Sequence, residues 1–269
     1  MRAAAHFRSE MAAALGTIFT GLAAGLLFPA LLLPLAASLS GKRKARGAII
    51  YACVTALVTV GAWFFARLAV DIEPPSAPAI YVEVATGVIV ITIMIALIGP
   101  VMLTQKLATV LDALVRHTGQ LTLFFILTMA LVQFAVVILR YVFGINSIFM
   151  QDSITYLHGS VFLLASGYAL LTDDHVRVDI IYREASEQFK ARVDLAGAYL
   201  FLFPFCLVSL WAAAPYVASS WGVLEGSTEQ SGIQAVFLLK TLIPVFLVLL
   251  AMAGFSQAAR AGDILRGER

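Results

Sequence analysis

The stretch LTLFFILTMALVQFAVVIL, residues 121–139, decides the fold class because it contains no charged side chain. An α-helix of about 20 apolar residues crosses a hydrocarbon core of roughly 30 Å. The apolar residues run continuously instead of alternating with polar ones, which excludes a strand of a membrane β-barrel. Gln133 is the most central polar residue, and an interhelical hydrogen bond is its expected use. The stretch therefore predicts a membrane-spanning helix.

Composition extends this prediction to the whole chain. Of its 269 residues, 61% are hydrophobic and 13% are charged, which is more apolar surface than a water-soluble domain can bury. The sequence therefore predicts an all-α polytopic membrane protein with about seven spans. The spans are expected at about 11–39, 47–70, 80–101, 119–140, 154–171, 194–220 and 235–258. Pro29 and Pro34 are expected to kink the first span or to end it early.

Charged residues between the spans indicate the orientation. The stretch GKRKARG (41–47) carries four basic residues and no acid, which favours the cytoplasm. DIEPPSAPAIYVE (71–83) carries three acids and no base, and SWGVLEGSTEQSGIQ (220–234) carries two acids and no base. Both are therefore predicted on the outer side. The carboxy terminus is then cytoplasmic and the amino terminus periplasmic.

Residues 1–40 allow a second interpretation, which is a cleaved signal peptide. The basic start and the small residues Ala36 and Ala37 fit such a signal. The apolar run is too long for one, however, and the basic cluster directly after it would resist translocation. We favour a retained helix, and the alternative stays open.

Residues 102–118, MLTQKLATVLDALVRHT, form a different pattern. Leucine and valine recur at helical spacing, while Gln105, Lys106, Asp112 and Arg116 occupy the rest of the helical wheel. This pattern predicts an amphipathic helix on the inner membrane surface. It divides the chain into a membrane extension of about three helices (1–101), the interfacial helix, and a four-helix domain (119–269).

The chain has few residues that could form a transport path or a nucleic-acid-binding surface. No predicted span has a cluster of charged residues at mid-depth, where ionisable groups mark ion and proton paths. A stand-alone channel or carrier is therefore disfavoured. No basic patch with interleaved aromatic residues indicates nucleic acid. Cys53 and Cys206 lie in apolar runs and behave as small hydrophobic residues.

The polar stretch DDHVRVD (173–179) is the strongest candidate for chemistry. Arg177 lies between His175 and Asp179 and would repel a divalent cation, and no second histidine or cysteine completes a metal shell. One alternative remains open, a small integral membrane enzyme that uses His175 and Asp179. We predict instead a salt-bridged structural element, with no catalytic, cofactor-binding or metal-binding residue in the chain.

Two cations near the outer ends of spans have two interpretations each. Lys240 lies inside the last span, and its long stem either reaches the outer interface or brings the ammonium group to Asp152 or to a partner subunit. Arg140, at the outer end of the fourth span, has the same alternatives.

Small residues in the fifth span predict helix packing. Gly159 and Ser166 are seven positions apart, as are Ser160 and Gly167. Such residues form a face that another helix can approach closely. The pattern favours association over reaction.

Three stretches carry a resemblance to a known family. They are RYVFGINSIFMQDSITYLHG (140–159), GYALLTDDHVRVDIIY (167–182) and LLKTLIPVFLVLLA (238–251). In this order, around four helices, they are fairly specific. From about residue 102 onward the chain resembles the small membrane subunit of tripartite ATP-independent periplasmic (TRAP) transporters, the DctQ-type family.

The resemblance implies a noncatalytic subunit of the bacterial inner membrane that scaffolds a large permease subunit. In such transporters a periplasmic binding protein delivers an organic anion, typically a carboxylate, and the large subunit moves it with sodium ions. This chain is then expected to need no cofactor, with sodium coupling on the large partner subunit. Substrate selectivity would lie in the other polypeptides.

The resemblance also implies roles for particular residues. His175, Arg177 and Asp179 fall in the inner-loop signature that braces the subunit interface. Asp152 matches an acid at the start of the family's second helix, although many members have paired acids there and this chain has Gln151 before one. The predicted structural and interface residues are Arg140, Asp152, His175, Arg177, Asp179, Lys240 and Pro244. The three amino-terminal helices lie outside the family's four-helix pattern.

Overall fold

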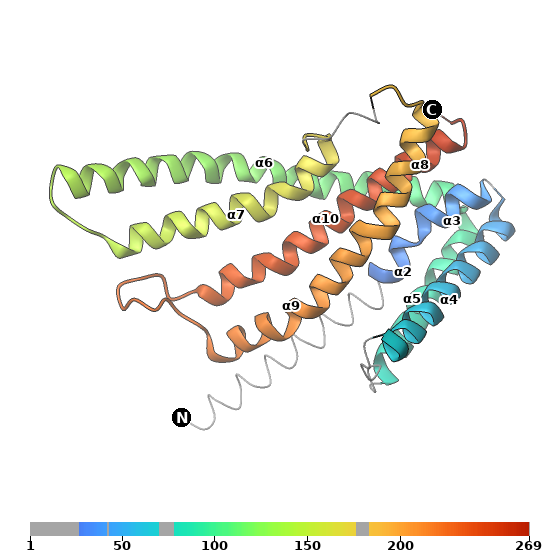
Figure 1. Ribbon diagram of the computed structural model, residues 1–269, viewed down its shortest axis with the longest axis horizontal. Coiled ribbons are helices and arrows are strands. Elements are labelled where there is room, and N and C mark those ends of the chain that lie inside the picture. Colours follow the sequence, from blue (N-terminus) through green and yellow to red (C-terminus); the bar gives the residue numbers. More distant parts are fainter. Residues whose placement is uncertain (1–26, 42, 70–77, 176–182, 269) are drawn as a thin grey trace. The chain divides into compact units, whose positions relative to one another are not determined.

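The computed structural model describes residues 27–41, 43–69, 78–175 and 183–268, without the side chains of 62–69 and 78–81. Every long element in these residues is helical (Figure 1). The helices are α2 (Phe28–Leu31), α3 (Leu33–Ser40), α4 (Lys44–Ala69), α5 (Pro78–Ile98), α6 (Pro100–Tyr141), α7 (Ile148–Thr172), α8 (Glu187–Gly197), the π-helix η2 (Ala198–Leu202), α9 (Phe203–Val223) and α10 (Val236–Leu265).

Helix length and hydropathy define a polytopic membrane protein. Among the described residues, five helical stretches are long and apolar enough to cross a bilayer. They are Lys44–Gly61, Pro100–Tyr141, Ile148–Thr172, Glu187–Val223 and Val236–Leu265. Phe28–Ser40 and Val82–Ile98 are shorter apolar helices at the other two expected positions. The all-α polytopic fold class predicted from the sequence is therefore confirmed.

The first helical segment is interrupted at Leu32, as the two prolines predicted. Pro29 lies in the first turn of α2 and Pro34 lies in the first turn of α3. A proline nitrogen carries no hydrogen, so Pro34 cannot bond to the carbonyl of Ala30 and the helical ladder is broken there. The part of the predicted first span before residue 27 lies outside the described residues.

Residues 102–118 are helical, but they are not a separate element. They form the first part of α6, which continues without interruption through the predicted fourth span to Tyr141. The physical reason is the absence of a stop signal, because Gly119 is the only helix-weakening residue at the expected boundary.

The absence of a Cβ at Gly119 allows α7 to pack closely against α6. A Cβ there would lie 2.3 Å from Cγ of Tyr168 on α7.

The described residues form two compact units, which are treated separately. The first contains 112–175 and 208–253, and the second contains 27–111, 183–207 and 254–268. Long helices cross from one unit to the other, so neither unit is continuous in sequence. The domain boundaries predicted from the sequence stay a prediction.

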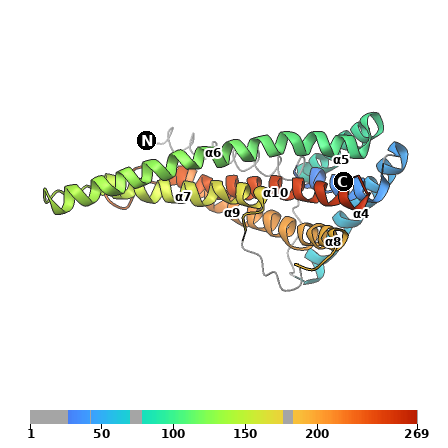
Figure 2. The same cartoon turned by 90° about the horizontal axis from the view of Figure 1, so that it is seen from above.

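The core of the first unit lies between α6, α7 and α10. Figures 1 and 2 show α7 next to the part of α6 in this unit. The buried residues that pack together are Val115, Leu164, Leu171, Leu249 and Ala253. Gly167 brings α7 against the backbone of α10, because a Cβ there would lie 2.9 Å from the carbonyl oxygen of Leu249. A Cβ on Gly159 would lie 3.1 Å from Leu239, so both glycines of the predicted small-residue face are used against α10.

The second unit contains the described amino-terminal helices. The helices α4 and α5 pack against each other, α3 contacts α4, and α2 contacts α5. Tyr51 of α4 is fully buried, and its hydroxyl donates a 2.9 Å hydrogen bond to the carbonyl of Pro29. The hydroxyl of Tyr199 in η2 contacts the backbone at the break between α2 and α3. The amino-terminal helices are therefore bound to the later part of the chain by specific contacts.

Candidate functional site at the loop between α9 and α10

The connection between α9 and α10, residues 224–235, is held in a defined shape by its own hydrogen bonds. The amide of Gly232 donates to the carbonyl of Glu229 at 3.0 Å, and the side-chain amide of Gln234 donates to the same carbonyl at 3.1 Å. The amide of Glu229 donates to the hydroxyl of Ser227 at 3.3 Å. These bonds replace water on polar groups that a flexible connection would leave solvated.

Asp152 joins this loop to α7. Its carboxylate accepts a 3.0 Å hydrogen bond from the amide of Ile233, and the hydroxyl of Tyr156, one turn later, donates to the carbonyl of Ile233 at 3.4 Å. The loop approaches so closely that a Cβ on Gly232 would lie 2.4 Å from the Asp152 carboxylate. Ile233 is thus held through both of its backbone polar groups by the first turns of α7.

Lys240 joins the other end of the loop to α10. Its ammonium group forms an ion pair with Glu225 and lies 4.1 Å from the ring centre of Tyr216 on α9. The Lys240 side chain is only 16% exposed and that of Glu225 is 37% exposed. An aromatic face attracts a cation through its quadrupole, so the ring and the carboxylate stabilise the same charge. Three elements therefore meet at one ammonium group.

The ion pair changes the titration of the loop acid. The hydrogen bond and charge of the Lys240 ammonium hold the pKa of Glu225 below its usual range. A lowered pKa means that the ionised carboxylate is favoured in the folded loop. The contribution to stability is present above the unfolded pKa and is lost as the pH falls through the folded pKa.

Aromatic contacts close the same end of the first unit. The indole nitrogen of Trp221 donates to the hydroxyl of Thr241 at 2.8 Å. The Trp221 ring meets the ring of Phe237 edge to face, with centroids 4.7 Å apart. The amide of Phe237 donates to the carbonyl of Glu225 at 3.3 Å. The end of α9 and the start of α10 are therefore fastened on both sides of the loop.

The structure brings two of the predicted site residues into this cluster. Asp152 and Lys240 both hold the loop, but the acid that Lys240 contacts is Glu225 and not Asp152. Pro244 is buried inside α10 one turn beyond Lys240. Because proline has no N–H, the carbonyl of Lys240 lacks its usual helical hydrogen bond. The helix is therefore locally irregular between Lys240 and Pro244.

The remaining predicted residues lie apart from the loop or outside the described residues. Arg140 is exposed in the last turn of α6, where a cation complements the helix dipole. His175 is exposed just after α7, which ends at Thr172 and is followed by Asp173 in the left-handed conformation. Arg177 and Asp179 lie outside the described residues, so their contacts with His175 stay a prediction.

Sequence reasoning did not assign Glu225 and Tyr216 to the site. Glu225 appeared only as one of two acids in the predicted outer loop at 220–234. The available signal was the cation itself, because a lysine inside an apolar helix requires an acid or an aromatic ring within reach. Tyr216 and Glu225 are the candidates that the preceding helix and loop supply.

The residues of this cluster hold the loop between α9 and α10 in place. Within the described parts of the chain, no group of three His, Cys, Asp or Glu residues could hold a metal ion. Lys240 and Glu225 are engaged with each other, and Asp152 is engaged with a backbone amide. The arrangement orders the loop between α9 and α10.

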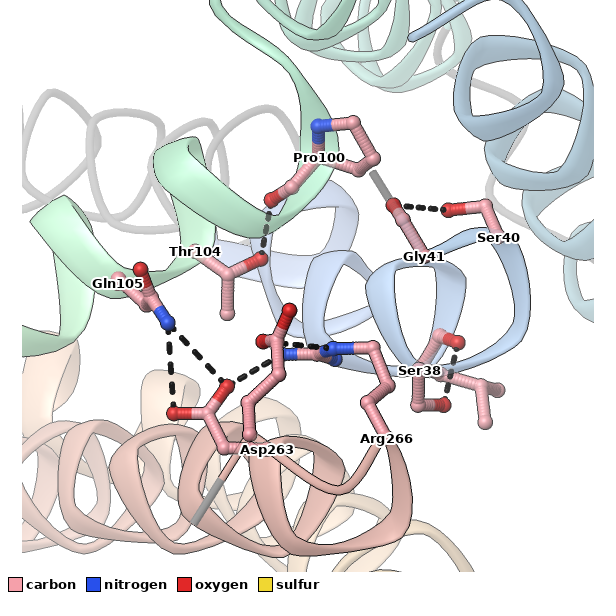
Figure 3. A network of polar contacts seen from close by, with 10 residues as sticks. Ser38, Ser40, Gly41, Pro100, Thr104, Gln105, Asp263 and Arg266 are labelled. Atoms are coloured by element: carbon pink, nitrogen blue, oxygen red, sulfur yellow. Dashed lines mark hydrogen bonds and ion pairs between the residues drawn. The ribbon is translucent and has the colours of Figure 1, made fainter. Parts of the chain in front are cut away.

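A second polar network lies in the second unit, near the carboxy-terminal end of α10. Asp263 is buried, forms an ion pair with Arg266, and accepts from the side-chain amide of Gln105 at 3.4 Å (Figure 3). Arg266 also contacts Glu268 at 3.2 Å. The network joins α10 to the start of α6, and a Cβ on Gly262 would lie 3.5 Å from Ser38 of α3.

Comparison with known proteins agrees with this architecture. Residues 129–262 match the model of the DctQ component of the tripartite ATP-independent periplasmic transporters. This part of the chain belongs to that family, which confirms the resemblance noted in the sequence. The match contains α7, the α9–α10 loop, and both Asp152 and Lys240. No curated protein and no solved structure gives a significant match.

Proposed function

We propose that the chain is the small integral-membrane subunit of a TRAP-type secondary transporter and that it scaffolds the large permease subunit. The observation that carries the proposal is the family match over 129–262, which covers the helices of the first unit beyond the middle of α6. A transporter component needs no catalytic residue, and the fastened loop cluster fits a role in assembly.

The transport reaction belongs to the complex and not to this chain alone. The large permease subunit moves an organic anion, with a carboxylate as the expected class, and couples the movement to sodium ions. A periplasmic binding protein delivers the anion. Within this chain, the partly buried cation Lys240 is occupied by Glu225 and Tyr216. That ammonium group is not available as a substrate ligand.

The α9–α10 loop is the part of this subunit that faces the binding protein. Its tip carries exposed polar residues, which are Thr228, Glu229, Gln230 and Ser231. The predicted orientation puts this tip on the periplasmic side of the bacterial inner membrane, with the carboxy terminus in the cytoplasm. Ordering by Asp152 and Lys240 reduces the entropy that the loop loses when it binds.

The test is transport and assembly with defined components. We expect this chain to copurify with the large permease subunit and uptake of the anion to fail in cells that lack this chain. Purified chain alone in liposomes should accumulate no organic acid. Unchanged sodium-driven uptake without this chain, or transport by this chain alone, would overturn the proposal.

A further inference from the structure

Four exposed basic side chains lie at the start of α4 and near the start of α6, two helix ends that contact each other. Arg43, Lys44 and Arg46 are exposed at the start of α4, and Lys106 is exposed in the second turn of α6. The first turns of α4 and α6 contain no acidic residue. We name these four residues the basic corner. All of them belong to the second unit.

Close contacts hold the basic corner together. A Cβ on Gly47 would lie 2.6 Å from Cγ of Pro100, so the first turn of α4 rests on the start of α6. The ammonium group of Lys44 donates to the carbonyl of Leu97 at 2.6 Å, and its stem passes over Gly99. Gly99 has φ +105, a conformation that permits the sharp turn between α5 and α6.

A hollow lies at this turn. It has a volume of about 210 Å³ and is lined by Ile98, Gly99, Pro100, Val101, Met102 and Gln105. Two of its lining residues, Gly99 and Pro100, are the ones that α4 contacts. The hollow therefore lies at the residues that contact the start of α4.

The electrostatics of the corner favour an anion. Cations at a helix amino terminus face the positive end of the helix dipole, so an anion that binds among them is stabilised by both. Two acids of the second unit, among its described residues, are already engaged. Asp263 contacts Arg266 and Gln105 (Figure 3). Glu268 contacts Arg266.

The side chains next to the cations indicate which class of anion this surface fits. Large apolar residues are exposed directly beside the cations, with Ile49 at 64%, Leu97 at 70% and Met102 at 50% exposure. A free inorganic anion makes no favourable contact with an apolar surface, whereas the acyl chains of a phospholipid cover it. Basic residues at the cytoplasmic end of membrane spans bind anionic headgroups in the same way.

We propose that the basic corner binds the phosphate group of an anionic phospholipid in the cytoplasmic leaflet. Arg43, Arg46 and Lys106 surround the phosphate, and the acyl chains run along the exposed apolar side of α4 and α5. The amino-terminal helices thus add a lipid site beyond the residues that match the family model, since that match begins at residue 129.

The first experiment measures lipid binding to the full chain by native mass spectrometry, with phosphatidylglycerol, phosphatidylcholine or inorganic phosphate added. We expect selective retention of phosphatidylglycerol. The variant R46Q/K106Q should bind it roughly tenfold or more weakly, because each cation near an anionic headgroup contributes roughly a factor of five. It keeps three of the four basic residues of 41–47, which preserves the orientation signal. R183Q/R192Q, which removes two exposed cations near α8, is the matched control and should leave binding unchanged.

The second experiment keeps the proposal testable if R46Q/K106Q does not fold. The wild-type chain is illuminated with a photoactivatable phosphatidylglycerol, and the labelled peptides are identified. We expect labels within 43–49 and 97–106. Equal binding by R46Q/K106Q, equal binding of phosphatidylcholine, full competition by millimolar phosphate, or labels confined to other segments would overturn the proposal.

Discussion

The hydroxyl of Tyr199 donates a 2.7 Å hydrogen bond to the carbonyl of Leu31, a residue 168 positions earlier. The same hydroxyl accepts a 3.0 Å hydrogen bond from the amide of Leu35. In an uninterrupted helix that amide would bond directly to the carbonyl of Leu31. Tyr199 therefore inserts its oxygen into the helical ladder at the break between α2 and α3. The proline break and the tyrosine together bind the amino-terminal helices to a residue of the DctQ match.

Replacing Tyr199 with phenylalanine tests this connection. Both backbone groups lose their partner in a partly buried place, which should cost about 1–3 kcal/mol. We expect Y199F to unfold at a lower temperature in detergent and to show faster proteolysis before residue 100. Y141F is the matched control, because Tyr141 is 79% exposed. Equal stability of Y199F and the wild type would show that the tyrosine does not hold the break.

The loop between α9 and α10 depends on Lys240. Replacement by glutamine removes the charge that Glu225 and Tyr216 share, so the loop loses its ion pair with α10. We expect K240Q to show faster amide hydrogen exchange in 224–235 and weaker copurification with the binding protein. The control is K190Q, which removes a lysine paired with a largely exposed Glu187 in the second unit. Unchanged exchange in the loop of K240Q would contradict the role given to this ammonium group.

The loop should also respond to acid through Glu225. Its pKa lies below the ordinary value of about 4.3, so the stabilisation is complete above that pH and disappears as the pH falls through the lowered pKa. The fluorescence of Trp221, which contacts Phe237 and Thr241, reports the change. We expect a transition below pH 4.3 that E225Q no longer shows. A transition that persists in E225Q would assign it to another group.

The fold was more predictable from the sequence than the site. Uncharged runs of helical length predicted the spans, and Pro29 and Pro34 predicted the interruption at Leu32, because both depend on local chain properties. The continuity of α6 was not visible, since the polar residues of 102–118 suggested a boundary although no residue there stops a helix. The partners of Lys240 and of Tyr199 depend on how distant helices pack, and one sequence does not encode that packing in any local pattern.

Gly167 tests the packing of α7 on α10. A Cβ at this position would lie 2.9 Å from the carbonyl oxygen of Leu249 and 3.0 Å from its carbonyl carbon, and the backbone of α10 cannot move aside without disturbing the core. We expect G167A to cost about 1–3 kcal/mol, as overpacking typically does, and to lower the yield of complex with the large subunit. G197A is the matched control, because nothing lies within 4 Å of a Cβ there and alanine favours a helix over glycine. If both alanine variants melt at the temperature of the wild type, the close approach of α7 and α10 is not required.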